Sequence, residues 1–281
     1  MNNIKNLDIK LCFGLSHMIL YFLIFKNSPN INFNICMNIE TFNNLRKGYD
    51  ISYIENQLSF LLYLCKYYKL NNIYIKNNNN ELNSLLINEW KLDNIKINLY
   101  DEFIPNIEIE YNNYIIINTK VSQIFFNDNE LFDLWNNKLK SELCDIINKS
   151  NLKIILIGEK NMSNCLEYNI HRYFMIYNDL KNNISNNKII DITDNNTIDL
   201  YEIDKIIKNM NIIKKAKFNI SIGFSGCTIL YTLLNNSLIF SHRLNFFDNY
   251  LSNTNYNEIY QNYFTINSDN FLNKLKEEVK K

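Results

Sequence analysis

The chain has 281 residues, which suits one large or two ordinary domains, because single hydrophobic cores usually stop growing at roughly 250 residues. Hydrophobic residues make up 47% of the chain and charged residues 21%, which provides enough apolar material for a packed core and argues against disorder. Lysine and arginine number 29, as do aspartate and glutamate, so the positive charge typical of nucleic-acid binders is missing and we expect no nucleic-acid partner.

The first apolar segment covers residues 11–25 and, at about fifteen residues, is shorter than the roughly 20 that a membrane-spanning helix needs. It contains Gly14, Ser16 and His17, and no small-residue cleavage site follows it. We therefore expect a buried strand and helix here, with no stable membrane anchor and no export signal. The six cysteines are scattered without a C-x-x-C, which predicts reduced thiols and a cytoplasmic location.

Along the chain, apolar runs of strand length alternate with segments of helical period, which is the pattern of β-α units around parallel sheets. In the first part this pattern predicts strands at 8–13, 31–37, 72–75 and 94–100 and helices at 17–25, 51–68 and 81–90. An acidic, proline-bearing stretch follows at 101–113, and we expect it to link two domains.

The same alternation restarts after this linker. It predicts strands at 114–118, 152–158, 188–193, 218–223 and 237–240 and helices at 129–149, 176–182, 200–215, 227–234 and 270–280. Two similar halves result, residues 1–108 and 109–281, and no repeat of solenoid period is visible. We therefore predict an α/β protein of two Rossmann-like domains that face each other across a cleft, with the helix at 270–280 closing the second domain.

Glycine is rare in this chain, with five residues in all, and its placement points to one kind of site. Gly14, Gly158, Gly223 and Gly226 lie at or just after the carboxyl end of a predicted strand. In open α/β sheets ligands bind at that edge, and glycine there allows a positive φ and a close approach of the ligand to the backbone. The glycines therefore predict a ligand site along the carboxyl ends of the strands.

Two of these glycines, Gly223 and Gly226, lie within four positions, and a helix is predicted to begin between them at Ser225. Its first turn has free N–H groups and a partial positive charge, and the hydroxyls of Ser225 and Thr228 add further donors. The sequence therefore predicts an anion pocket that suits a nucleotide diphosphate. A tight turn that packs the helix closely against the strand is the alternative explanation of the same glycines.

The segment DITDNNTIDLYEIDKIIKNMNIIKKAKFNISIGFSGCTILYTLLNNSLIF, residues 191–240, resembles the last nucleotide-binding part of glycosyltransferases of the GT-B fold, particularly the heptosyltransferase-like group. The runs NNYIIINTK and LKIILIGEK resemble the first two strands of that family's carboxyl-terminal domain, and CFGLSHMILYF resembles its amino-terminal first turn. The resemblance implies transfer of a sugar from a nucleotide-sugar donor, bound mainly by the second domain, to a glycan or small acceptor held by the first.

The chain departs from this family's pattern at its most informative positions. Phe224 stands where the family has an aspartate before the Ser-Gly, and Ile229 stands where it has a histidine, so donor contacts by those side chains are missing. In the first turn, Ser16 and His17 stand where the family has an aspartate as base. Other GT-B enzymes place a histidine in this loop, and the ordinary pKa of histidine suits proton transfer near neutrality, so we expect His17 to be the catalytic base. A helix-start histidine bonded to the backbone is the alternative.

Further candidate residues lie at or near the ends of the predicted strands. Lys120 follows the strand at 114–118, where its charge would reach the donor phosphates. Glu159 follows Gly158, where it would accept hydrogen bonds from ribose or sugar hydroxyls. Solvated loop positions explain both residues equally well. The remaining candidates for the cleft are Gly14, Ser16, Arg172, His242 and Arg243.

No Asp-x-Asp occurs in the sequence, whereas glycosyltransferases of the GT-A class normally use that motif to hold a divalent metal. No P-loop and no G-x-G-x-x-G occurs either. We therefore expect a metal-independent glycosyltransferase that needs no cofactor besides its nucleotide-sugar substrate. Two alternatives remain open: a non-catalytic binding module of the same fold, which Phe224 and Ile229 favour, and a sugar-nucleotide epimerase or pyruvyl-type transferase on the same two-sheet layout.

Overall fold

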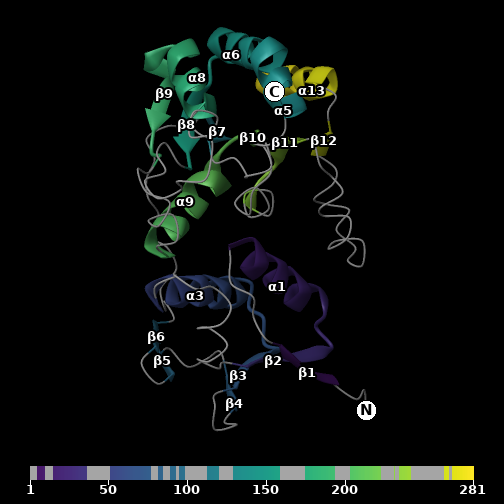
Figure 1. Ribbon diagram of the computed structural model, residues 1–281, viewed down its shortest axis with the longest axis vertical. Helices are drawn as coiled ribbons and strands as arrows, with labels where there is room; N and C mark the ends of the chain where they lie inside the picture. The colour runs from purple at the N-terminus through teal and green to yellow at the C-terminus, as the bar shows by residue number, and fades with distance from the viewer. Residues whose placement is uncertain are drawn as a thin grey trace. The chain divides into compact units, whose positions relative to one another are not determined.

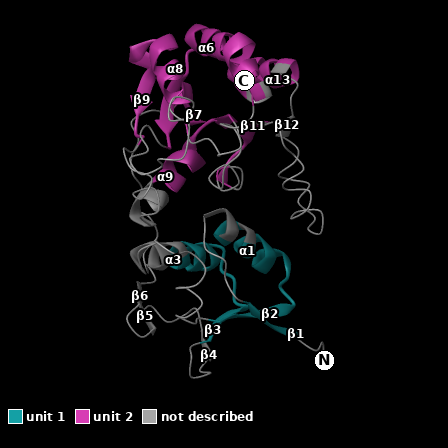
Figure 2. Ribbon diagram, in the orientation of Figure 1, with its two compact units in different colours: residues 1–105, 201–203 teal, residues 106–200, 204–281 magenta. Residues whose placement is uncertain are grey.

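Figure 1 shows a computed structural model of the chain. It describes residues 5–9, 15–36, 51–76, 82–84, 89–92, 95–98, 113–119, 129–158, 175–193, 203–222, 231, 234–241, 263–265 and 268–281. For some of these, among them residues 15–17 and 203–208, the description covers the backbone alone. The chain divides into two units, which are coloured separately in Figure 2: unit 1 comprises Met1–Pro105 and Tyr201–Ile203, and unit 2 comprises Asn106–Leu200 and Asp204–Lys281.

Unit 1 is built on a four-stranded sheet with the order β1-β2-β3-β4. Its strands are β1 (Lys5–Ile9), β2 (Ile31–Cys36), β3 (Ile73–Lys76) and β4 (Leu82–Ser84), of which the first three are parallel and β4 is antiparallel to β3. The connecting helices α1 (Leu15–Asn27) and α3 (Ile51–Tyr67) lie on the same side of this sheet (Figure 1). A separate antiparallel pair consists of β5 (Glu89–Leu92) and β6 (Ile95–Asn98).

Aromatic side chains join the two helices of unit 1 to each other and to the sheet. The ring of Phe25 in α1 is fully buried, and its centroid lies 4.7 Å from that of Phe33 in β2. The ring of Phe22 lies 4.9 Å from Tyr68, which directly follows α3. The buried side-chain amide of Asn72 donates to three carbonyls of the α1–β2 connection, so β3 is tied to the same core.

Unit 2 is built on a six-stranded parallel sheet with the order β12-β11-β10-β7-β8-β9. Its strands are β7 (Tyr114–Asn118), β8 (Lys153–Ile157), β9 (Ile189–Asp191), β10 (Asn219–Ile222), β11 (Ser237–Ser241) and β12 (Tyr263–Thr265). The chain starts in the middle at β7, adds β8 and β9 on one side, and then returns to the other side with β10. This is the Rossmann strand order 3-2-1-4-5-6, and the direction of strand addition reverses between β7 and β10.

Helices cover both faces of the unit 2 sheet (Figure 1). One face, which we call the core face, carries α5 (Asn129–Leu134), the π-helical stretch η1 (Trp135–Leu139), α6 (Lys140–Lys149), α8 (Met175–Asn183) and α13 (Ser268–Lys280). The other, which we call the α9 face, carries α9 (Ile203–Lys215). Side chains alternate between these faces along each strand. Ile115 and Ile117 belong to the core face, whereas the hydroxyl of Tyr114 donates to the carbonyl of Ile212 in α9 at 2.7 Å.

The core face is filled by large side chains from four helical segments and the sheet. Trp135, Phe240 and Phe271 are fully buried, and the rings of Phe240 in β11 and Phe271 in α13 lie 5.5 Å apart. The indole Nε1 of Trp135 donates to the carboxylate of Asp179 in α8 at 2.8 Å, which satisfies the one polar group of this side chain. These contacts join η1 to α8 and α13 to the sheet.

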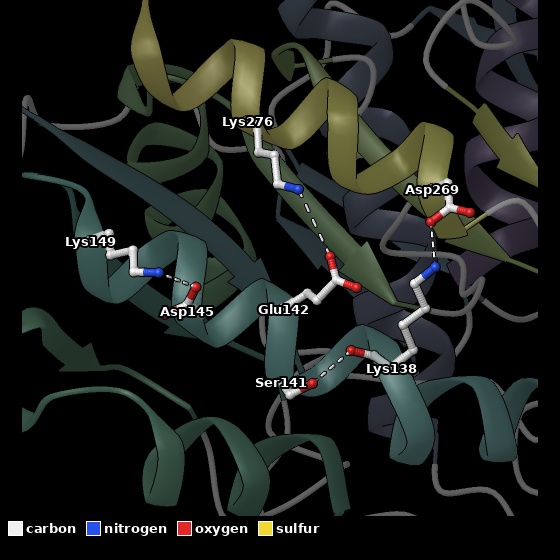
Figure 3. A network of polar contacts seen from close by, with 7 residues as sticks. All are labelled: Lys138, Ser141, Glu142, Asp145, Lys149, Asp269 and Lys276. Carbon is white, nitrogen blue, oxygen red and sulfur yellow. Dashed lines mark hydrogen bonds and ion pairs between the residues drawn. The ribbon is translucent and has the colours of Figure 1, made fainter.

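Ion pairs also connect α13 to α6 and η1 (Figure 3). Lys138 pairs with Asp269, and Lys276 pairs with Glu142 at 3.9 Å. All four side chains are at least partly exposed, so water and salt screen their attraction and the pairs add little stability. The helix is held instead by its apolar face, on which Phe271 is the largest buried side chain.

The prediction of an α/β chain with parallel sheets is confirmed, and the structure corrects it in detail. The helix predicted at 81–90 is wrong, because residues 82–84 form β4 and residues 89–92 form β5. This segment contains Asn83 and Asn88, which are poor helix formers, and pairing with β3 and β6 supplies its backbone hydrogen bonds. The first strand lies earlier than predicted, at Lys5–Ile9, and the edge strand β12 was not predicted at all.

Two further expectations concern the helices. Most of the helix predicted at 227–234 lies outside the described residues. The apolar segment at 11–25 contributes the helix α1, which begins at Leu15, two residues before the predicted start. Throughout the part of the chain that the structure describes, each helix falls short of the length and hydrophobicity needed to cross a bilayer.

If packing rather than surface charge holds α13, Phe271→Ala should lower the free energy of unfolding by about 3–5 kcal/mol, because it leaves a cavity in the core. Lys276→Ala, which removes a surface ion pair on the same helix, should leave it nearly unchanged. Urea unfolding followed by circular dichroism measures both. Equal losses in the two variants would contradict this account of the helix.

Candidate functional site

The carboxyl ends of β7, β8 and β10 meet at one edge of the unit 2 sheet. Asn118, the last residue of β7, is the register partner of Ile157 in β8 and of Ser221 in β10. The strand order reverses between β7 and β10, and open α/β sheets bind their ligands outside the carboxyl ends of the strands at such a switch point. We call this edge, with Asn118, Thr119, Gly158 and Ser221, the switch-point edge, and it is the candidate functional site.

Gly158 follows β8 directly and has a φ of 112°. This backbone conformation strains any residue with a Cβ, so the position requires glycine. The same absence of a side chain leaves the backbone open to a ligand that approaches the end of β8. The placement of a glycine at a strand end, which singled out Gly158 in the sequence, therefore has a conformational cause in the structure.

Thr119 fixes the point at which the chain leaves β7. Its backbone N–H and its buried hydroxyl both donate to the carbonyl of Ile157, at 2.8 and 3.1 Å. These two bonds extend the pairing of β7 with β8 by one residue beyond the strand. The ends of the two strands are thereby held rigidly side by side, which is the property that a precise binding site needs.

The α9 face is polar at this edge. Ile117, Ile220 and Ile222 belong to the core face, so the alternation of side chains directs Asn118 and Ser221 toward the α9 face. Asn118 is fully buried and Ser221 is 1% exposed. Among the described residues, the hydroxyl of Ser221 has no hydrogen-bond partner.

Asp191 places a carboxylate at the carboxyl end of β9, the outermost strand of the sheet beyond β8. One oxygen of Asp191 accepts hydrogen bonds from the N–H and hydroxyl of Thr193, and the other accepts from the hydroxyl of Tyr177 at 2.6 Å. Burial opposes ionisation, but these hydrogen bonds outweigh it and hold the pKa of Asp191 below its ordinary value. Burial and the bond to Asp191 raise the pKa of Tyr177 to about 12. Both carboxylate oxygens are engaged, so Asp191 anchors β9 to α8.

Unit 1 has a second group of polar side chains, on the face of its sheet opposite α1 and α3. The side chain of Asp8 accepts from Asn34 at 2.7 Å and pairs with Lys76 at 3.2 Å, so the group spans β1, β2 and β3. The hydrogen bonds from Asn34 and Lys76 hold the pKa of Asp8 below its ordinary value. Burial raises the pKa of the neighbouring Cys36 thiol, which therefore stays protonated at neutral pH. This group joins the strands across the sheet.

Most of the site residues predicted from the sequence lie outside the described residues. They are Gly14, Lys120, Glu159, Arg172, Gly223, Ser225, Gly226, Thr228, His242 and Arg243. Ser16 and His17 belong to the first turn of α1, where the structure describes the backbone alone. Gly158 is described and lies at the switch-point edge. The roles of all these residues, Gly158 included, stay predictions.

Sequence reasoning missed Asn118, Thr119 and Ser221. Their signal was present, because Asn118 and Thr119 end the run YIII and Ser221 interrupts the isoleucines of NISI. Polar residues within a fully buried parallel strand are unfavourable unless they have a partner. Such an interruption at the carboxyl end of a strand is therefore a usable signal of a site.

Within the described residues, no group of three His, Cys, Asp or Glu side chains is arranged to hold a metal ion. Comparisons of this chain with protein-family models, with curated proteins and with solved structures gave no match. We therefore infer function from the residues and geometry of this chain.

The conformation of Gly158 predicts that Gly158→Ala lowers the free energy of unfolding by about 1–3 kcal/mol, because alanine is strained at a φ of 112°. Lys69, which follows α3, has a φ of 54° and provides the matched control. Lys69→Gly should raise the stability, since glycine adopts this conformation without a Cβ clash. Thermal unfolding of both variants measures the effects, and a change of the same sign in both would contradict the conformational argument.

The lowered pKa of Asp191 predicts a contribution to stability that depends on pH. The ionised carboxylate stabilises the fold above the pKa of the unfolded chain, about 3.9, and this contribution is lost as the pH falls through the lower folded-state pKa. Asp191→Asn should therefore unfold with a flatter pH dependence below about pH 4. Urea midpoints measured across the acid range test this, with Asp145→Asn, an exposed surface carboxylate, as the control. Identical profiles for Asp191→Asn and the wild type would contradict it.

Proposed function

We propose that the chain is a metal-independent glycosyltransferase of the GT-B type, which binds the nucleotide part of its sugar donor at the switch-point edge of unit 2. The observation that carries the proposal is the reversal of strand order between β7 and β10. Gly158 at the same edge adds support. Its positive φ requires glycine, and glycine has no Cβ that would keep a ligand away from the end of β8. The resemblance of residues 191–240 to the donor-binding part of GT-B enzymes selects the nucleotide-sugar among the ligands that such an edge accepts.

The proposal assigns the predicted residues to two tasks. Holding the departing diphosphate needs N–H groups or positive charge, which the turn around Ser225 and the side chain of Lys120 would supply. Lys120 directly follows Thr119 in the sequence, and Thr119 is bonded to Ile157 at this edge. Glu159 directly follows Gly158 and would accept hydrogen bonds from ribose or sugar hydroxyls. Removing the proton of the acceptor hydroxyl is the second task, and it falls to His17 in α1.

In this proposal the two units form a GT-B pair that faces a common cleft, with the acceptor held by unit 1. The structure of unit 1 is consistent with a GT-B domain, because its three parallel strands joined by α1 and α3 have the arrangement of half a Rossmann fold. The acceptor is a glycan or another small molecule.

We place the protein in the cytoplasm, where thiols such as the unpaired Cys36, Cys65 and Cys144 stay reduced.

A non-catalytic binding module of the same fold is the second candidate. Phe224 and Ile229 favour it, because they replace the two side chains that the resemblance implies for donor contacts. Such a module would bind the same class of ligand at the switch-point edge without transferring the sugar. The two candidates therefore share a binding prediction and differ in turnover.

The binding prediction is tested by thermal unfolding with UDP, GDP, CDP, ADP, dTDP and their common sugars, with and without EDTA. A nucleotide present at ten times its Kd should stabilise the protein by roughly 1.4 kcal/mol, which raises Tm by about 2–4 °C for a chain of this size. We expect a shift with one base that EDTA leaves unchanged. The absence of a shift with all of these nucleotides would contradict the proposed function.

The nucleotide identified in this way then serves in a transfer assay against glycans and small acceptors. We expect turnover by the wild type and loss of turnover in His17→Ala, with the affinity for the nucleotide retained because His17 belongs to unit 1. Binding without turnover across the acceptor panel would favour the binding module.

A further inference from the structure

The hydroxyl of Ser221 differs from that of Ser237, the other serine that is described as buried in the unit 2 sheet. Ser237 in the adjacent β11 is equally buried, at 1% exposure, but its hydroxyl donates to the carbonyl of Asn235 and accepts from the side chain of Asn219. The hydroxyl of Ser221 is likewise 1% exposed, yet it bonds to no atom of the described residues. A buried hydroxyl without a partner lowers the stability of the fold, so its presence in a central strand needs an explanation.

The position of Ser221 supplies that reason. It is the second-last residue of β10 and the register partner of Asn118, so the two side chains lie next to each other on the α9 face of the two strands that flank the switch point. Asn219 also has a buried atom without a partner in the described chain, its Oδ1, but it lies at the amino end of β10 and its amide donates to Tyr231 and Ser237. Ser221 is thus placed where a ligand of an open α/β sheet binds.

The chemistry of this edge favours an anion over a sugar hydroxyl as the partner. The side chains that the structure describes at the carboxyl ends of β7, β8 and β10 are neutral, and the hydroxyl of Ser221 can donate a hydrogen bond, whereas that of Thr119 already donates to the carbonyl of Ile157. Among the described residues, Asp191 places a carboxylate at the end of β9, with both oxygens engaged; Glu159, which directly follows Gly158, lies outside the described residues. A hydroxyl that donates to a charged oxygen forms a stronger bond than one that donates to a neutral group.

We propose that the Ser221 hydroxyl donates a hydrogen bond to a phosphate oxygen of the nucleoside diphosphate that binds at the switch-point edge. The inference rests on the proposed function and adds a specific contact to it. It also explains why the hydroxyl bonds to none of the described residues, since a partner there would compete with the ligand. Ser221 is a binding residue in this account and takes no part in proton transfer.

The test compares Ser221→Ala with Ser237→Ala, two substitutions of equally buried serines in neighbouring strands. In the free protein, Ser221→Ala removes a hydroxyl that bonds to nothing described, so Tm should stay the same or rise. Ser237→Ala removes two hydrogen bonds, so Tm should fall. Calorimetric titration then gives Kd for the nucleoside diphosphate that stabilises the wild type most and for the corresponding nucleoside, which lacks the phosphates.

We expect Ser221→Ala to weaken binding of the nucleoside diphosphate about 10-fold, as the loss of one bond to a charged group predicts, and to leave binding of the nucleoside unchanged. Ser237→Ala should leave both unchanged. An unchanged Kd of the diphosphate in Ser221→Ala, or an equal loss for the nucleoside, overturns the inference and leaves the proposed function standing. Failure of the wild type to bind any nucleotide overturns the proposed function, and this contact falls with it.

Discussion

The parallel pairing of β7 with β8 on one side and β10 on the other is the constraint on which the rest of unit 2 depends. All five residues of β7 are buried, so the strand must be covered on both faces. Covering both faces requires helices on each, and the chain supplies α6, α8 and α13 for one face and α9 for the other. Because α9 crosses from β9 back to β10 beside β7, the strand order reverses there, and the reversal creates the edge at which a ligand can bind.

The same pairing explains why the polar residues of this edge are informative. A strand buried on both faces favours β-branched apolar residues, as the three isoleucines at 115–117 in β7 show. Asn118 and Ser221 break this rule in adjacent strands at the same level of the sheet, and the hydroxyl of Ser221 bonds to none of the described residues. Departures from local rules that have no structural compensation concentrate at functional sites. The unpartnered hydroxyl of Ser221 at the carboxyl end of β10, beside the buried Asn118, is therefore, within the described residues, the strongest physical argument for a ligand.

Sequence patterns predicted the parts of this fold in which local and tertiary preferences agree. The isoleucine-rich runs at 114–118 and 152–158 and the periodic helix at 51–68 were correct because burial and propensity favour the same state there. The segment at 81–90 failed because pairing with β3 and β6 outweighed a helical spacing of leucines. At the site, the φ of Gly158 follows from a pattern visible in the sequence. The pairing of Asn118 with Ser221 does not, because strand order and register bring together residues 103 positions apart (221 minus 118).

The most direct test of a ligand site at the switch-point edge is the pattern of backbone amide NMR shifts on addition of the nucleotide that stabilises the protein most. The account predicts the largest changes at Asn118, Thr119, Gly158 and Ser221. Amides at the opposite ends of the same strands, those of Tyr114, Lys153 and Asn219, should change little. Largest changes at those amino ends, or in β1, β2 and β3 of unit 1, would contradict the account and move the ligand to another part of the chain.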